Sequence, residues 1–165
     1  MLVTADEFRK RLDHGQLRLA LVGMSNSGKS TCTALLASEL SFDFFEVDEA
    51  INSELGIDSM AAAAEWMGYP FEPNYSSNKR RYLDLEARFS RVKIPDQNFV
   101  LDTTGSIVYA KREILDWIRE NFLVVGLRVS EELCQTLIED YFAHPKTVIW
   151  GKEFEQKAGE SGTDA

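Results

Sequence analysis

Apolar positions along the chain fall into two kinds of segment, which differ in length and in spacing. Short runs in which most residues are apolar predict strands buried on both faces of a sheet. Longer segments in which apolar residues recur at intervals of three and four predict helices with one buried face. The predicted strands are residues 18–22, 42–47, 98–101 and 122–128, and the predicted helices are residues 5–13, 29–40, 49–55, 59–67, 75–91, 109–120 and 131–142.

Strands and helices alternate along the chain, and this order determines the fold class. Parallel strands need long crossover connections, which helices usually provide. The order therefore predicts a three-layer α/β fold, in which a parallel sheet of about four strands is flanked by helices. Right-handed crossovers bring the carboxyl ends of the strands to one edge of the sheet, where we expect the ligand.

The length and the composition favour a single domain. At 165 residues, with 44% hydrophobic and 27% charged residues, the chain matches ordinary globular proteins. We expect residues 1–165 to form one domain. Residues 143–157 have little periodicity and are predicted to form a lid segment, whereas the polar residues 158–165 are predicted to be a mobile tail.

The charge of the chain narrows the choice of partners. A net charge of -9 and a pI near 4.8 argue against a protein that binds nucleic acid or a membrane surface. The sequence has no apolar stretch that would span a bilayer and no signal-peptide pattern. Cys32 and Cys134 lack the spacing of metal ligands and are typical of reduced thiols. We expect a cytoplasmic protein with a small-molecule substrate, and its oligomeric state stays open.

The most specific motif lies between the first strand and the second helix. Residues 23–30 read Gly-Met-Ser-Asn-Ser-Gly-Lys-Ser and fit the phosphate-binding loop G-x-x-x-x-G-K-[ST] at every fixed position. Backbone N–H groups of such a loop and of the following helix N-terminus surround a polyphosphate. The motif predicts a P-loop NTPase fold that binds ATP and Mg²⁺. The residues predicted to bind the nucleotide are Gly23, Ser25, Asn26, Ser27, Gly28, Lys29, Ser30 and Thr31.

Acidic residues follow the second and third predicted strands. Glu46 and Asp48 have the spacing that puts two acids on one face of a strand, and Asp102 ends the apolar run 99–101. We predict that Glu46 and Asp102, with the Ser30 hydroxyl, hold Mg²⁺. Asp48 is predicted to orient or deprotonate an attacking hydroxyl, so that Lys29 and Asp48 are the catalytic pair. The alternative for Asp48 is that it only caps the next helix.

Four further residues are candidates for contact with the substrate or its transferring phosphate. Thr104 and Gly105 lie in a polar turn after the third strand, where hydroxyl and N–H groups suit a polar ligand, although a capped turn explains them too. Arg81 belongs to the cationic cluster 79–81, which is either a solvated helix face or a source of one arginine for an anionic substrate. Lys146, in the predicted lid, is placed to approach the transferring phosphate if the lid closes.

The order of these features resembles the shikimate kinases. In that family the acid two positions beyond the metal-side acid contacts the substrate hydroxyl, and it falls on Asp48. Glu46 stands where the family usually has an aspartate, and the family's Gly-Gly-Gly turn falls near residues 104–106. The family's Arg-Pro lid matches residues 146–147 only loosely. Uncharacterised shikimate-kinase-like proteins resemble the chain more closely, in the segments 66–70, 101–106 and 148–151.

The resemblance also implies a strand and a helix after the lid, so we expect that this chain is truncated. Two readings of function follow. The first is an ATP-dependent kinase that phosphorylates a hydroxyl of a small polar metabolite. The second is a catalytically degenerate nucleotide-binding protein that acts through a partner. A GTPase-type switch is less favoured, because the chain has no Asn-Lys-x-Asp motif for reading guanine.

Overall fold

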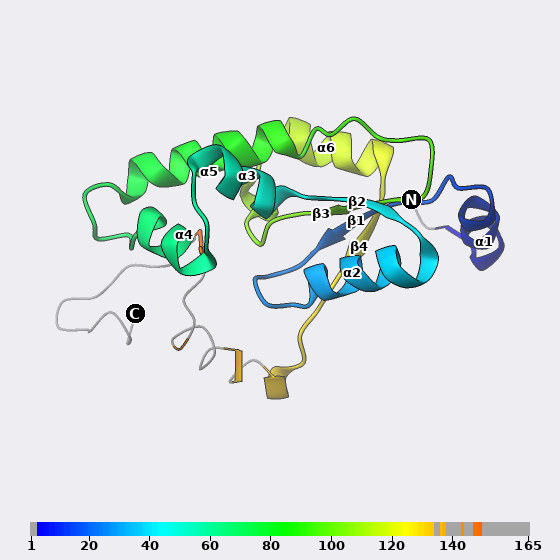
Figure 1. Ribbon diagram of the computed structural model, residues 1–165, viewed down its shortest axis with the longest axis horizontal. Coiled ribbons are helices and arrows are strands. Elements are labelled where there is room, and N and C mark those ends of the chain that lie inside the picture. Colours follow the sequence, from blue (N-terminus) through cyan, green and yellow to red (C-terminus); the bar gives the residue numbers. More distant parts are fainter. Residues whose placement is uncertain (1–2, 134–135, 138–142, 144–146, 150–165) are drawn as a thin grey trace.

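A computed structural model describes residues 3–133, 136–137, 143 and 147–149 of the chain. Its centre is a sheet of four parallel strands in the order β2-β3-β1-β4 (Figure 1). The strands are β1 (Arg18–Val22), β2 (Asp43–Glu46), β3 (Phe99–Asp102) and β4 (Leu123–Gly126). The predicted α/β class with a parallel sheet is confirmed.

Helices cover both faces of the sheet. Figure 1 shows α2 on one side and α3, α5 and α6 on the other. The helices are α1 (Ala5–Asp13), α2 (Lys29–Leu40), α3 (Val47–Leu55), α4 (Met60–Met67), α5 (Tyr75–Phe89) and α6 (Arg112–Asn121), with a 3₁₀ turn η1 (Ile107–Tyr109) before α6. No helix in the part of the chain that the structure describes is long and apolar enough to cross a membrane.

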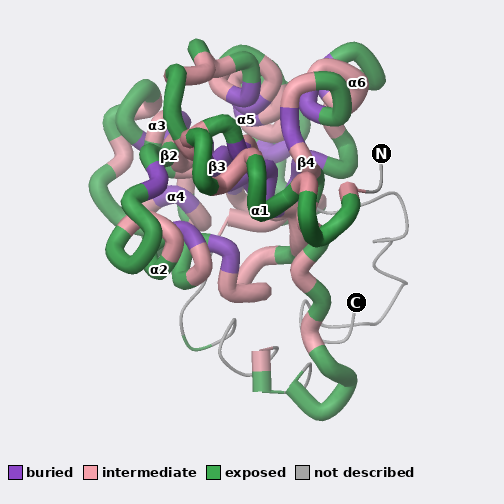
Figure 2. Tube along the Cα trace, turned by 90° about the vertical axis from the view of Figure 1, so that its right-hand side faces the viewer, coloured by how far each residue is buried: buried purple, intermediate pink, exposed green. Residues whose placement is uncertain are grey.

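The core has two parts, because successive side chains of a strand point to opposite faces. Leu19, Leu21 and Val100 pack on the α2 side. Ala20 and Leu101 pack on the other side, against residues of α3, α5 and α6. Figure 2 shows the buried residues concentrated around β3 and the inner side of α5. The apolar runs of the central strands β1 and β3 are therefore explained by burial on both faces. The edge strands β2 and β4 expose Phe44 and Val124, so the prediction of burial on both faces is wrong for these two.

Element boundaries differ from the predictions at a few places. Strand β2 ends at Glu46, and Val47 already begins α3. The predicted helix 109–120 is divided, because Ala110 and Lys111 have extended backbone between η1 and α6. Much of the predicted helix 131–142, most of the predicted lid 143–157 and the whole predicted tail 158–165 lie outside the described residues.

The end of α1 is tied to the start of β3 by one side chain. The amide nitrogen of Asn98 donates to the carbonyl of Leu12 at 2.9 Å, and its amide oxygen accepts from the N–H of Leu17 at 2.9 Å. Leu17 is 1% exposed, so water cannot easily replace this bond. Asn98 therefore connects three parts of the chain that are far apart in sequence.

We expect that Asn98→Ala lowers the free energy of unfolding by about 1–3 kcal/mol, because it leaves the buried Leu17 N–H without its acceptor. Urea denaturation followed by circular dichroism measures this change. Gln97→Ala, at the exposed neighbouring position, is the control and should change stability by less than about 0.5 kcal/mol. Equal stabilities of the two variants would contradict the role given to Asn98.

Candidate active site

The phosphate-binding loop connects β1 to α2, as the motif predicts. Gly28, the N-cap of α2, has φ +89°, and Asn26 has φ +63°. A Cβ atom on Gly23 would lie 2.5 Å from Ser27 Oγ and 2.8 Å from the carbonyl oxygen of Leu127. Gly23 is therefore required by close contact, whereas Gly28 is favoured by its left-handed backbone.

Lys29 folds back over this loop. Its side chain is only 7% exposed, and Nζ donates to the carbonyl oxygens of Gly23 and Met24, at 3.1 Å each. The other predicted nucleotide ligands lie along the same loop: Ser25, Asn26 and Ser27 are half-buried, and Ser30 and Thr31 are exposed at the start of α2. The loop thus presents its polar groups around the helix N-terminus, where a phosphate is favoured.

Glu46 and Asp102 are brought together by the register of the sheet, in which they are directly paired at the ends of β2 and β3. Asp102 is 4% exposed. Burial raises the pKa of Asp102, whereas the nearby Ser30 hydroxyl and the Lys29 ammonium act in the opposite direction. The pKa of Glu46 is raised by burial and by the neighbouring Asp102 carboxylate. Ser30, Glu46 and Asp102 therefore share one corner of the fold.

This corner has the oxygen chemistry that suits Mg²⁺. The buried Asp102 Oδ2 has no hydrogen-bond partner among the described residues. Within that part of the chain no three Asp, Glu, His or Cys side chains form a group that holds a metal unaided. A site with few protein ligands is typical of Mg²⁺, which usually binds one or two carboxylates together with substrate phosphates and water. The residues present fit that ion.

Asp48 lies in the first turn of α3, beside this corner. The hydroxyl of Tyr82 on α5 donates to Asp48 Oδ1 at 2.5 Å. Burial raises the pKa of Asp48, and the Tyr82 hydrogen bond and the Lys29 ammonium partly offset that effect. No side chain caps α3 at its N-cap, Glu46. The Asp48 carboxylate is thus bonded to Tyr82, and its contact with an acceptor hydroxyl stays a prediction.

Glu86 is a residue that the sequence predictions missed. It is 0% exposed, and its Oε1 accepts hydrogen bonds from the hydroxyls of Thr104 and Ser106, the second at 2.5 Å. The pKa of Glu86 is raised by burial, against the effect of these two hydrogen bonds. A signal was present in the sequence: Glu86 follows Tyr82 by four positions and so lies within the apolar stripe of α5.

The remaining candidates lie in different surroundings. Thr104 is 0% exposed and directs its hydroxyl to Glu86. Gly105 packs against the phosphate-binding loop, because a Cβ atom there would lie 3.0 Å from the Ser25 nitrogen. Arg81 is exposed on α5, and none of the described contacts joins it to Asp48 or Thr104. Lys146 lies outside the described residues. Substrate contact by these residues stays a prediction.

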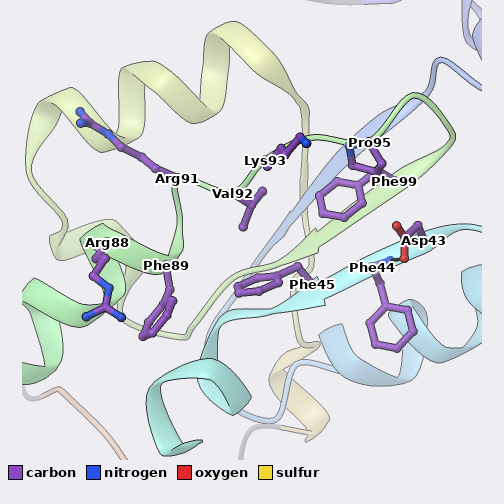
Figure 3. A pocket seen from close by; sticks show the side chains of 10 residues that line it. All are labelled: Asp43, Phe44, Phe45, Arg88, Phe89, Arg91, Val92, Lys93, Pro95 and Phe99. Atoms are coloured by element: carbon purple, nitrogen blue, oxygen red, sulfur yellow. Dashed lines mark hydrogen bonds between the residues drawn. The ribbon is translucent and has the colours of Figure 1, made fainter. Parts of the chain in front are cut away.

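A groove of about 360 Å³ lies elsewhere, beside the edge strand β2 (Figure 3). Phe45, Phe89 and Val92 point into it, and Arg88 and Arg91 lie at its rim. Arg88 is ion-paired with Glu54 at 3.1 Å. The groove includes Asp43 and Phe99, which begin β2 and β3, so it lies away from the strand ends that carry Glu46 and Asp102. It is therefore separate from the candidate active site.

The sequence profile of the family described as shikimate kinase matches residues 25–148. The chain belongs to the shikimate kinase family. The matched segment includes Lys29, Asp48, Glu86 and Asp102, whereas Gly23 of the phosphate-binding loop lies just before it.

Curated shikimate kinases are similar to the chain over part of their length. The shikimate kinase of Thermodesulfovibrio yellowstonii is 24% identical over 115 residues, which cover 70% of this chain and 60% of that protein. The shikimate kinase of Marinomonas sp. is 31% identical over 120 residues, which cover 72% of this chain and 60% of that protein. The alignments thus span about 60% of the length of these relatives.

Solved shikimate kinases share the fold. The enzyme from Acinetobacter baumannii, in complex with shikimate, gives a TM-score of 0.54 at 22% identity, covering 73% of this chain and 62% of that chain. The enzyme from Aquifex aeolicus gives 0.51 at 23% identity, covering 77% of each. At these identities the comparison supports the P-loop kinase fold, and the substrate is a separate question.

We expect the chain to gain stability as the pH falls from 7 toward 5. A carboxyl group whose pKa is raised by folding binds more protons in the folded state, so its stabilising effect is complete below the unfolded pKa and is lost as the pH rises through the folded pKa. The pKa of Glu86 is raised in this way. Glu86→Gln should therefore increase stability relative to the unmodified chain at pH 7, and this difference should shrink at pH 5.

Urea denaturation at both pH values measures the difference. Glu54→Gln, a change at a partly exposed carboxylate that pairs with Arg88, is the control. A stability difference for Glu86→Gln that does not depend on pH, or that grows as the pH falls, would contradict the raised pKa.

Proposed function

We propose that this protein transfers the γ-phosphoryl group of ATP to a hydroxyl of a small polar metabolite, and that shikimate is the first acceptor to test. The observation that carries the proposal is that the buried Lys29, at the phosphate-binding loop, lies near both Asp48 and Asp102, where its ammonium acts to lower the pKa of each carboxyl group. Membership of the shikimate kinase family supports the same reaction. We also propose that the protein acts in the cytoplasm as a single domain.

The nucleotide side of the mechanism follows from the phosphate-binding loop. Lys29 would exchange the carbonyl oxygens of Gly23 and Met24 for the β- and γ-phosphates. The backbone N–H groups of the loop and the N-terminus of α2 would bind the same phosphates. Ser30, with Glu46 and Asp102, would hold Mg²⁺, which supplies neutralisation of phosphate charge when bound.

The acceptor side is centred on Asp48. Its carboxylate is held by Tyr82, and its pKa is raised by burial. A carboxylate with a raised pKa accepts a proton more readily, so Asp48 would orient the acceptor hydroxyl and take its proton as the phosphoryl group is transferred. Catalysis would come mainly from positioning and from charge stabilisation.

A second function has one observation in its favour. The turn that carries the predicted substrate contacts already uses its hydroxyl groups within the protein, because Thr104 and Ser106 both donate to Glu86 on α5. This arrangement suits a nucleotide-binding protein without transferase activity that acts through a partner. The two functions differ in whether a hydroxyl compound raises ATP turnover above the rate of ATP alone.

We expect ATP·Mg²⁺ to bind with a dissociation constant in the micromolar range, about −8 kcal/mol in binding free energy, and shikimate to tighten this binding. Calorimetric titration measures both. Lys29→Ala should abolish phosphoryl transfer and leave the fold intact, whereas Lys93→Ala, at an exposed position, should retain it. Unchanged turnover in a folded Lys29→Ala variant would contradict the mechanism, and ATP binding without transfer to any hydroxyl compound would favour the second function.

We expect Asp48→Asn to lower phosphoryl transfer by about 10²-fold or more, a typical effect of losing a positioned base. The affinity for ATP should stay close to that of the unmodified chain, because Asp48 acts on the acceptor. Steady-state kinetics and calorimetry measure the two quantities, and Glu49→Gln, at the exposed neighbouring position, is the control. A loss of ATP affinity with unchanged transfer at saturation would instead assign Asp48 to the metal side.

A further inference from the structure

Glu86 is buried without the kind of partner that normally accompanies a buried carboxyl group. None of its described contacts is with a Lys or Arg side chain, and its Oε2 has no hydrogen-bond partner among the described residues. Its bonding is concentrated in Oε1, which accepts from both Thr104 and Ser106. Burial of a carboxyl group is costly, and an apolar residue of similar volume is often at least as stabilising. Core packing alone therefore does not account for Glu86.

The turn that Glu86 holds touches two parts of the candidate active site. It begins at Asp102 and is fixed to the end of β1, where Thr103 Oγ1 donates to the Leu21 carbonyl at 2.7 Å. Its Gly105 lies against the phosphate-binding loop, since a Cβ atom there would be 3.0 Å from the Ser25 nitrogen. Movement of this turn would therefore disturb both Asp102 and the backbone that surrounds the phosphates.

The same helix also holds the acceptor side. Tyr82 precedes Glu86 by one helical turn on α5, and its hydroxyl donates to Asp48 Oδ1 at 2.5 Å. Residues four apart lie on one face of a helix. Tyr82 and Glu86 thus attach one rigid face of α5 to two separate segments: the start of α3, which carries Asp48, and the turn after β3.

We infer that Glu86 is a positioning residue, which fixes the 103–106 turn against the phosphate-binding loop and keeps that turn in register with Asp48 through α5. Its effect on catalysis rests on the proposed phosphoryl transfer. Its effect on the turn does not. An acceptor oxygen at this position is what the turn requires, so glutamine can replace glutamate and an apolar side chain cannot.

Hydrogen exchange tests the effect on the turn without any need for activity. The methionine side chain is similar in length to glutamate and lacks the acceptor oxygens. In Glu86→Met the backbone amides of residues 102–110 should therefore exchange about tenfold faster, because the turn opens more often. Glu86→Gln should exchange them at nearly the original rate. Ser90→Ala is the matched control: Ser90 is one turn further along α5 and 0% exposed, and its hydroxyl has no hydrogen-bond partner among the described residues.

Kinetics with ATP·Mg²⁺ and shikimate tests the effect on catalysis. Glu86→Met should lower kcat at least tenfold, a size typical of misplaced reacting groups. The KM for ATP should rise as well, because Gly105 of the turn lies against the phosphate-binding loop, and Glu86→Gln should recover most of the rate. If Glu86→Met does not fold, the double variant Thr104→Val, Ser106→Ala removes the same hydrogen bonds from the other side and should give the same exchange and the same kcat.

Each outcome decides the inference. Faster exchange in the turn for Glu86→Met, with Glu86→Gln and Ser90→Ala unchanged, supports it. The inference is overturned if exchange in the turn is unchanged in Glu86→Met, or if Ser90→Ala accelerates it equally. It is also overturned if kcat falls only in proportion to the lowered unfolding temperature of each variant. If the unmodified chain does not phosphorylate shikimate, the proposed acceptor fails, and the exchange result alone decides the role of Glu86.

Discussion

The parallel pairing of β1 with β3 is the constraint on which the rest of the site depends. Leu21 is paired with Asp102, and the N–H of Thr103 extends the ladder to the Leu21 carbonyl at 3.3 Å. Both strands therefore end at the same level. The phosphate-binding loop leaves one strand and the Asp102 turn leaves the other, so groups 70 to 80 residues apart become neighbours through backbone hydrogen bonds. The pairing of β2 with β3 adds Glu46 in the same way.

Four carboxyl groups and one ammonium group determine the electrostatics of this edge. Burial raises the pKa of Glu46, Asp48, Glu86 and Asp102, and the Lys29 ammonium is the cation that acts on both Asp48 and Asp102. Such a concentration of carboxyl groups with raised pKa is unfavourable for folding and typical of functional sites. A divalent cation would bring the charge that complements these carboxyl groups.

Much of the scaffold was predictable from the sequence, because it depends on local patterns. The strand 18–22 and the helix 29–40 have the predicted bounds, since an apolar run and a glycine-bounded loop are visible without tertiary information. The contact between Tyr82 and Asp48 was not predictable, because it joins residues 34 positions apart. Arg81 illustrates the opposite case, in which two neighbours in sequence lie in different surroundings. It neighbours Tyr82 in sequence, but adjacent residues on a helix point about 100° apart, and Arg81 is exposed.

The turn after β3 is held on two sides by different kinds of contact. At Gly105 it lies close to the phosphate-binding loop, where a Cβ atom would be 3.0 Å from the Ser25 nitrogen. On either side of Gly105, Thr104 and Ser106 donate their hydroxyls to Glu86 on α5. Thr104, Ser106 and Glu86 therefore form one hydrogen-bonded unit that spans two elements. Replacing any one of them by an apolar residue would leave the others as buried polar groups with fewer partners, so substitutions at these three positions should be tolerated together more readily than singly.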